Sequence, residues 1–108
     1  MNVKLTRHVT QDDMTRYSGT GNIHSSEESA RRAGLEAPIA QGMMTIAYAS
    51  ELLTQIHGPG WLERGSITVT FTAPVFAGDD VTIEMEGENV RAVNQAGRLL
   101  MVGTARLR

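Results

Sequence analysis

Hydrophobic and polar positions along this chain change from a helical spacing to an alternating one near its middle. Between Ile39 and His57 the apolar residues point in nearly every direction around a helix, and polar residues return together only from Ser50. A helix that is apolar most of the way round is typically buried by its neighbours. At about 1.5 Å per residue it would extend about 27 Å, close to the width of a small domain. The pattern therefore predicts one long buried helix over residues 39–57.

Three segments after this helix are predicted strands, at residues 66–72, 81–86 and 98–106. The first two alternate strictly between apolar and polar residues, whereas the third is apolar on both faces in its middle. An apolar run of that kind suits a strand that is covered on both sides, for instance at a subunit contact. The two segments that connect these strands, at residues 73–80 and 94–97, contain turn residues and are short enough to join antiparallel neighbours. We therefore expect a meander of at least three antiparallel strands.

Two short helices are predicted before the long helix, each preceded by a residue that can cap its first turn and opened by carboxylates. They span residues 11–17, capped by Thr10, and residues 27–33, capped by Ser25 or Ser26. A strand is predicted before them, because residues 3–9 alternate. Between the two helices, residues 18–22 read Ser-Gly-Thr-Gly-Asn, which is the composition of a loop. This loop leads directly to His24.

One face of the predicted sheet must cover the long helix, because a lone sheet and a lone helix bury their apolar surfaces on each other. The predicted fold class is therefore α+β, with an antiparallel sheet wrapped around one central helix in the hot-dog architecture. A length of 108 residues predicts one such domain over residues 1–108. A single sheet leaves an edge open to pairing. We therefore expect a homodimer with two sheets joined edge to edge, or a higher homo-oligomer.

Composition narrows the classes of partner and chemistry. A net charge of −2 gives no reason to expect nucleic acid or an anionic membrane as partner. The absence of cysteine excludes disulfides and thiolate chemistry, and the three histidines lack the spacing of metal ligands. We therefore expect neither a metal nor a cofactor. No segment resembles a signal peptide or a membrane span, so a cytoplasmic protein is expected.

Four motifs follow one another along the chain. They are Tyr-Ser-Gly-Thr-Gly-Asn-Ile-His at residues 17–24, residues 30–34, Pro-Ile-Ala-Gln-Gly-Met-Met at residues 38–44, and Phe-Thr-Ala-Pro-Val-Phe-Ala-Gly-Asp at residues 71–79. In this order they resemble the MaoC-like hydratase/dehydratase family of hot-dog proteins, and the resemblance spans nearly the whole chain. It implies that the protein adds water to, or removes it from, acyl thioesters of coenzyme A or of a carrier protein.

The resemblance also implies roles for individual residues. His24 matches the catalytic histidine, Asn22 matches the asparagine of the same loop, and Gly42 matches the glycine whose backbone N–H polarises the thioester carbonyl. The loop is one residue shorter than in the family and lacks its proline. Thr20 or Gly19 stands where the family places its catalytic aspartate. The predicted catalytic set is therefore His24, Gly42, Asn22 and Thr20. Separately from the resemblance, Gln41, Met43 and Tyr48 near the start of the long helix are predicted to bind the substrate.

Hydration of an enoyl thioester needs a base for water, an acid for Cα and a stabilised enolate oxygen. A histidine can take and give a proton near neutral pH, and N–H groups at a helix start can stabilise the oxygen. The carboxylates nearest the loop in the sequence are those of Asp12, Asp13, Glu27 and Glu28, which as first-turn residues are more simply solvated.

Some residues keep a structural alternative. Gln41 stands at the position before the glycine, where the family often has a histidine. Met43 and Tyr48 suit either a core or an acyl pocket. His57 and Trp61 are expected to cap and pack the end of the long helix.

Two further functions remain open because an aspartate is absent from the loop. One is another hot-dog reaction on an acyl thioester or biosynthetic intermediate, such as hydrolysis or cyclisation. The other is a non-catalytic subunit that binds acyl groups. For a coenzyme A substrate, the candidate phosphate contacts are surface arginines: Arg31, Arg32, Arg64, Arg91 and Arg98.

Overall fold

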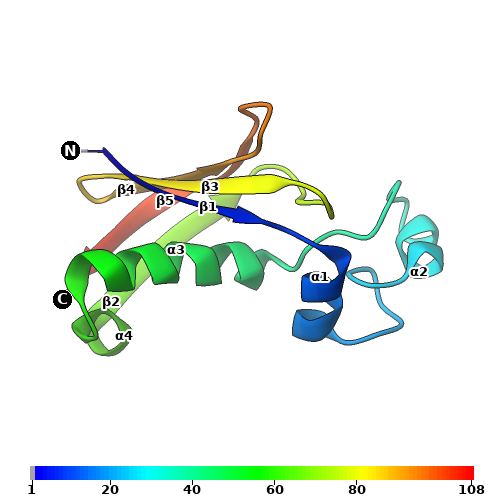
Figure 1. The fold of residues 1–108 in the computed structure, drawn as a ribbon, viewed down its shortest axis with the longest axis horizontal. Helices are drawn as coiled ribbons and strands as arrows, with labels where there is room; N and C mark the ends of the chain where they lie inside the picture. The colour runs from blue at the N-terminus through cyan, green and yellow to red at the C-terminus, as the bar shows by residue number, and fades with distance from the viewer. Residues whose placement is uncertain (1) are drawn as a thin grey trace.

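A computed structural model describes residues 2–108 as one sheet, one long helix and three short helices. In chain order the elements are β1 (Asn2–His8), α1 (Gln11–Ser18), α2 (Glu27–Arg32), α3 (Gly42–His57), α4 (Gly60–Arg64), β2 (Gly65–Phe71), β3 (Asp80–Glu86), β4 (Asn89–Val93) and β5 (Leu99–Leu107). Figure 1 shows α3 lying along the sheet, with α1 and α2 beyond the start of α3 and α4 beyond its end.

The sheet has the strand order β1-β3-β4-β5-β2, and every neighbouring pair is antiparallel. Its inner face packs on α3, because alternate residues of the strands are apolar. Val81, Ile83 and Met85 of β3 are buried with Leu52 and Leu53 of α3. One sheet packed on one central helix confirms the predicted α+β hot-dog fold.

The predicted neighbours at residues 66–72 and 81–86 are not neighbours, so this part of the predicted meander is wrong. β2 pairs with β5 at one edge, and β3 to β5 alone form a meander. The connection over residues 72–79 crosses about 14 Å of sheet, at about 4.8 Å per strand. Eight residues reach about 26 Å when extended, so the segment is long enough to cross. β4 was not among the predicted strands, because it is short and its polar face carries Asn89 and Arg91.

A bulge accounts for two successive buried residues in the continuous apolar run of β5. Ala92 pairs with Met101 but Val93 pairs with Leu99, so Leu100 is one extra residue on β5. Leu100 and Met101 are consequently both buried, whereas the next residue, Val102, is 42% exposed on the outer face. A bulge lets two successive residues escape the strict alternation of a strand.

The long helix begins at Gly42, three residues later than predicted. Ile39 instead forms a β-bridge with Phe76, and the Ala40 N–H donates to the Val75 carbonyl at 2.8 Å. These backbone bonds keep the preceding segment extended and hold it against the crossover. The start of α3 is thereby tied to the end of the sheet.

The long helix is also not covered on every side within one protomer. Its residues Met44, Ala49, Leu52 and Leu53 are buried, but Met43 is 53% exposed on another side. At its other end, His57 stacks on Trp61 with ring centroids 6.0 Å apart. That contact confirms the predicted packing of these two residues.

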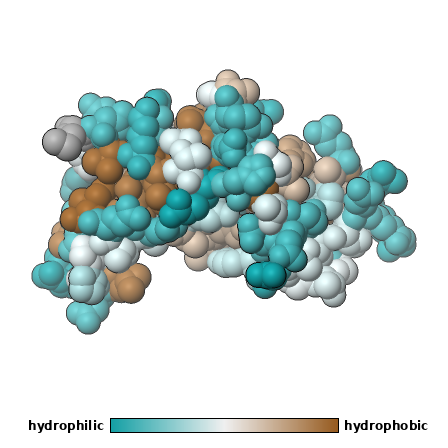
Figure 2. Space-filling model, in the orientation of Figure 1, coloured by the Kyte–Doolittle hydropathy of each residue, from teal (hydrophilic) through white to brown (hydrophobic). Residues whose placement is uncertain are grey.

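Hydrophilic and hydrophobic side chains are unevenly distributed over the surface. Figure 2 shows hydrophobic side chains gathered where the sheet lies over α3, whereas hydrophilic side chains cover α1 and α2. Within residues 2–108, no helix combines the length and the hydropathy that crossing a membrane requires.

Candidate functional site

The loop before His24 is held by the side chain of Asn22. Its Oδ1 accepts hydrogen bonds from the His24 backbone N–H at 2.9 Å and from the Ser25 hydroxyl at 3.3 Å. Its Nδ2 donates to the Ser18 carbonyl at 2.8 Å. Gly21 adopts a φ of +76°, a left-handed conformation that favours glycine. The loop is therefore ordered by an amide side chain, although it lacks the proline of the family loop.

The ring of His24 is anchored to the main chain just before α3. Its Nδ1 lies 2.8 Å from the carbonyl oxygen of Ile39. A carbonyl can only accept, so Nδ1 carries the hydrogen and Nε2 keeps its lone pair. The Ile39 N–H in turn donates to the Ile23 carbonyl at 3.1 Å, and Gln11 donates to the His24 carbonyl at 3.0 Å. The ring of His24 is thus held through Nδ1, and Nε2 is the nitrogen left without a protein partner in residues 2–108.

The start of α3 presents backbone N–H groups without acceptors from its own helix. Gly42 is the first helical residue, and Gln41 before it makes no side-chain capping bond. The first N–H groups of a helix have no intrahelical partner, and the helix dipole makes them favour negative charge. Gly42 also packs closely: a Cβ at this position would lie 2.7 Å from Cζ of Phe71. This helix start can therefore receive a carbonyl oxygen beside an aromatic ring.

A mainly apolar cavity of about 450 Å³ lies beside Gly42. Its lining combines the start of α3 with the crossover and the sheet end: Ile39, Ala40, Gly42, Thr45, Phe71, Ala73, Pro74, Val75 and Leu100. An apolar cavity with few polar groups is typical of a site for a small hydrophobic ligand. It can hold an acyl chain whose carbonyl lies at the Gly42 N–H.

Phe71 and Leu100 line the cavity but were not among the predicted site residues. Phe71 belongs to one of the four motifs, and its place there could have indicated that it belongs to the site. Leu100 reaches the cavity through the bulge in β5, and no local pattern indicates that displacement.

Other predicted site residues lie elsewhere. Thr20 is exposed and Gln41 is half-buried, while Met43 extends largely into solvent. Tyr48 lines a separate hollow of about 420 Å³ that also includes Arg7. Burial raises the pKa of the Tyr48 phenol, and the negative charge of Asp13 raises it further. The structure therefore ties Asn22 and His24 to Ile39 in the segment before α3, and neither is among the residues that line the cavity beside Gly42. Tyr48 lies at a different hollow.

A family model described as MaoC like domain matches residues 1–103. The chain belongs to the MaoC-like domain family. Its sequence is 37% identical over 65 residues to an (R)-specific enoyl-CoA hydratase of Aeromonas caviae. That stretch is 59% of this MaoC-like chain and 48% of the relative, so it spans about half of the relative's length.

Two solved structures share the fold of this MaoC-like chain. The (R)-hydratase from A. caviae involved in PHA biosynthesis has a TM-score of 0.79 at 23% identity, covering 100% of this chain and 95% of that one. R-Hydratase PhaJ1 from Pseudomonas aeruginosa has a TM-score of 0.77 at 25% identity, covering 97% of this chain and 77% of that one. The sheet and central helix are therefore those of MaoC-like hot-dog structures.

The carboxylates near the MaoC-like loop are mostly engaged elsewhere. Asp12 pairs with Arg16 at 3.0 Å, and two further helical pairs join Glu27 to Arg31 and Glu28 to Arg32. All three pairs are exposed. In the described residues 2–108, the ring bond of His24 is to a backbone carbonyl and not to a carboxylate. These side chains consequently do not take the place of the family aspartate.

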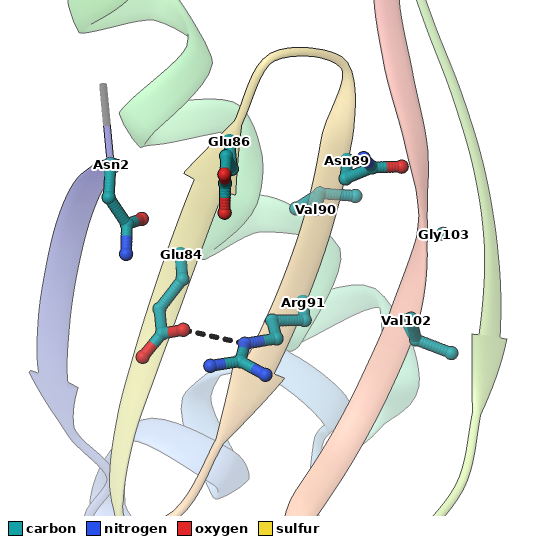
Figure 3. A pocket seen from close by; sticks show the side chains of 8 residues that line it. All are labelled: Asn2, Glu84, Glu86, Asn89, Val90, Arg91, Val102 and Gly103. Atoms are coloured by element: carbon teal, nitrogen blue, oxygen red, sulfur yellow. Dashed lines mark hydrogen bonds and ion pairs between the residues drawn. The ribbon is translucent and has the colours of Figure 1, made fainter.

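Another hollow, lined by charged side chains, lies on the outer face of the MaoC-like sheet, away from α3. Figure 3 shows Glu84 and Arg91 pointing toward one another across neighbouring strands. Arg91 Nε lies 2.6 Å from Glu84 Oε2, and Lys4 Nζ lies 3.7 Å from Oε1. The Glu84 carboxylate is neutralised on both sides, whereas Glu86, which also lines the hollow, has no ion pair in residues 2–108. Across residues 2–108, no cluster of three or more potential ligands is placed to hold a metal ion.

The Glu84 ion pairs predict a pH-dependent contribution to stability. The hydrogen bond from Arg91 lowers the pKa of the Glu84 carboxyl, and the charge of Lys4 lowers it further. Stabilisation is then fully present above the ordinary pKa of the unfolded chain and is lost as the pH falls through the lower folded value. Glu84→Gln should lower the free energy of unfolding by about 0.5–1 kcal/mol at pH 7, and by much less near pH 2.

Urea unfolding at the two pH values measures this difference. Glu86→Gln, on the same strand and without an ion pair in the described residues, is the matched control. An equal loss for Glu84→Gln at both pH values would show that its contribution is not electrostatic.

Proposed function

We propose that this MaoC-like protein hydrates 2-enoyl thioesters, or dehydrates 3-hydroxyacyl thioesters, of coenzyme A or a carrier protein. The observation that carries the proposal is the anchoring of the His24 ring on Ile39, three residues before the free N–H of Gly42. A base and an oxyanion donor are the two groups that the reaction needs most. The similarity to an (R)-specific enoyl-CoA hydratase supports the same reaction class.

The reaction would begin when His24 Nε2 takes a proton from water. The water oxygen then forms a bond to C3 of the enoyl group, and the C2–C3 double bond moves its electron pair into the thioester as an enolate. The Gly42 N–H and the helix dipole stabilise the enolate oxygen; one such donor contributes roughly 3–4 kcal/mol in other enzymes. The protonated Nε2 finally delivers its proton to C2. One histidine therefore serves as both base and acid.

The direct test is the loss of enoyl absorbance when the protein is mixed with crotonyl-coenzyme A. Hydration is the expected result. Failure to turn over short or medium enoyl thioesters, with coenzyme A or with a carrier protein, contradicts the proposal.

A second candidate function is favoured by Thr20, which is exposed and offers no carboxylate. With a single acid/base group, the site would also suit hydrolysis of a thioester or a rearrangement of the acyl chain. Release of free thiol from an acyl-coenzyme A identifies hydrolysis. Calorimetric binding of an acyl-coenzyme A without any turnover would identify a non-catalytic acyl-binding subunit.

We further propose that two copies join through the open edge of β2. β2 carries no charged side chain, whereas the other edge strand, β1, carries Lys4, Arg7 and His8. Charged side chains on an edge strand discourage pairing, so β2 is the edge left free to pair. Phe71 beside it is 49% exposed and would be covered by the second copy.

The backbone register shows which groups of β2 face that edge. The Thr72 N–H donates to Leu100, and the Arg108 N–H donates to Arg64, both at the β2–β5 side. Alternation in an antiparallel pair then directs the N–H of Val69 to the open edge. Val69 is therefore a suitable place to remove an edge donor without removing a β2–β5 bond.

Val69→Pro is expected to weaken the dimer by about 100-fold or more. Each of two symmetry-related copies loses an edge donor and gains a proline ring, for a total of about 3 kcal/mol. Analytical ultracentrifugation at micromolar concentration measures the change. Val69→Ala also loses packing but keeps its N–H, so it should remain dimeric. A wild-type monomer at this concentration, or a dimeric Val69→Pro protein, contradicts pairing through β2.

A further inference from the structure

Thr45 is the one polar residue that is buried in the part of the chain that the structure describes. It is 3% exposed, and it lines the cavity beside Gly42, whose remaining walls are apolar. A valine would fill the same shape without an oxygen. The position therefore carries a polar atom that an apolar cavity wall does not require.

The hydroxyl of Thr45 has no protein partner in residues 2–108. Thr54, in the same helix, donates its hydroxyl back to the Ser50 carbonyl at 2.7 Å. Thr45 makes no such bond with the carbonyl of Gln41, which accepts the Met44 N–H. The unbonded hydroxyl oxygen of Ser18 is fully buried, whereas the hydroxyl oxygen of Thr45 is not. Because Thr45 lines the cavity, the accessible part of its hydroxyl faces the cavity.

The position of Thr45 relative to Gly42 fixes where on a ligand this hydroxyl can act. Residues three apart lie on the same face of a helix, about 4.5 Å apart along its axis. With the thioester carbonyl at the Gly42 N–H, that separation corresponds to about three or four carbon–carbon bonds of about 1.5 Å each. For an acyl chain that runs along α3 from Gly42 toward Thr45, the hydroxyl is level with about the fifth atom of the chain.

We propose that Thr45 is a specificity-determining residue whose hydroxyl donates a hydrogen bond to an oxygen near the fifth position of the acyl chain. The inference rests on the proposed function, because it takes the thioester carbonyl to lie at Gly42. It assigns a substrate class: short acyl thioesters that carry an ether, hydroxyl or carbonyl oxygen beyond the reacting double bond. A plain alkyl chain leaves the buried hydroxyl without a partner, and such a mismatch reduces the affinity for that chain.

Two isosteric substrates test this assignment. Hex-2-enoyl-coenzyme A and 4-methoxybut-2-enoyl-coenzyme A have acyl chains of equal length, and the second has oxygen as its fifth atom. The ratio of their kcat/KM values is compared in the wild type, Thr45→Val and Thr45→Ser. The ratio should fall by about 5-fold in Thr45→Val, as expected for one neutral hydrogen bond, and be retained in Thr45→Ser. Comparing ratios removes the effect of the ether on the intrinsic reactivity of the double bond.

The result also separates a substrate contact from a purely structural role. Thr45→Val should unfold at the same temperature as the wild type or higher, because an unmet buried hydroxyl is removed. An unchanged substrate ratio in folded Thr45→Val protein overturns the assignment.

Absence of hydration in the wild type contradicts the proposed function, and the inference is then decided by binding. Calorimetry with 4-methoxybutanoyl-coenzyme A and hexanoyl-coenzyme A should show tighter binding of the ether, with the difference lost in Thr45→Val. Equal affinity for both ligands, or no binding of either, overturns the inference.

Discussion

His24→Ala is expected to lower kcat/KM for crotonyl-coenzyme A by about 10²–10⁴-fold, the range for a lost acid/base group. In the proposed reaction the ring accepts a proton from water and returns it to C2, and no carboxylate bonds to it in residues 2–108. Initial rates of absorbance loss at saturating and subsaturating substrate measure the change. The main effect should be on kcat, because a group that acts in the transition state contributes little to binding of the substrate.

His8→Ala is the matched control for this substitution. His8 lies at the end of β1, where its Nδ1 is 2.7 Å from an Asp80 carboxylate oxygen on an exposed strand pair. Its removal should leave the hydration rate within about 2-fold of the wild type, because surface ion pairs contribute little. Equal losses for both variants would indicate general destabilisation. A fully active His24→Ala protein would remove His24 from the reaction.

Gly42→Ala is expected to lower kcat/KM by about 100-fold with little change in thermal stability. The new methyl group would lie 2.7 Å from Phe71 Cζ and 2.9 Å from Cε2, so the ring must move. Phe71 is half-exposed and can turn outward, and alanine favours a helix over glycine, so the two effects on stability oppose each other. A displacement of about 1 Å at a reacting carbonyl can cost about 100-fold in rate.

A double variant distinguishes the two possible causes of that loss. Phe71→Leu shortens the side chain, so adding it to Gly42→Ala should relieve the clash and restore part of the rate. The pair should therefore be non-additive, as expected for residues in contact. A double variant with the summed loss of both single variants would show that the clash with Phe71 is not what impairs the site.

Local features of the fold were predictable because they depend on a few adjacent residues. The Thr10 hydroxyl accepts from the Asp13 N–H at 3.0 Å, and Ser26 caps the next helix in the same way at 3.2 Å. The predicted strands at residues 66–72 and 81–86 lie within one residue of β2 and β3. Capping and alternation act over one helical turn or two strand positions, so sequence pattern captures them.

Features that depend on distant partners were not predictable in this way. The helix α3 begins at Gly42 and not at the predicted Ile39, because Ile39 and Ala40 bond to segments that are remote in sequence. The pairing of β2 with β5 likewise depends on which of several apolar edges is free. Alternation predicts that a strand exists, but not which strand lies next to it.

In the candidate site, too, some residues could be predicted from local sequence and others depend on distant packing. The motif resemblance implied roles for His24, Asn22 and Gly42; the structure bonds His24 to Ile39, three residues before Gly42 at the start of α3. The apolar character of the long helix placed Tyr48 in a substrate-binding set, whereas Tyr48 lines another hollow, on the side of α3 that carries Met44. Which side of a helix faces a cavity is decided by the packing of the sheet around it. Thr45, which does line the cavity, could not be distinguished from a core residue by its place in the helix.

The anchor of His24 has a consequence for how this site tolerates sequence change. The acceptor on Ile39 is a main-chain carbonyl, which every amino acid supplies, and the N–H of Ile39 that bonds to Ile23 is absent only in proline. Substitutions at position 39 other than proline therefore leave the orientation of the imidazole intact. An insertion or deletion between residues 24 and 39 changes the main-chain path that joins the two partners. We expect related chains to conserve the number of residues between position 39 and the histidine, whereas the residue type at position 39 is limited by its place in the apolar cavity wall and not by the imidazole.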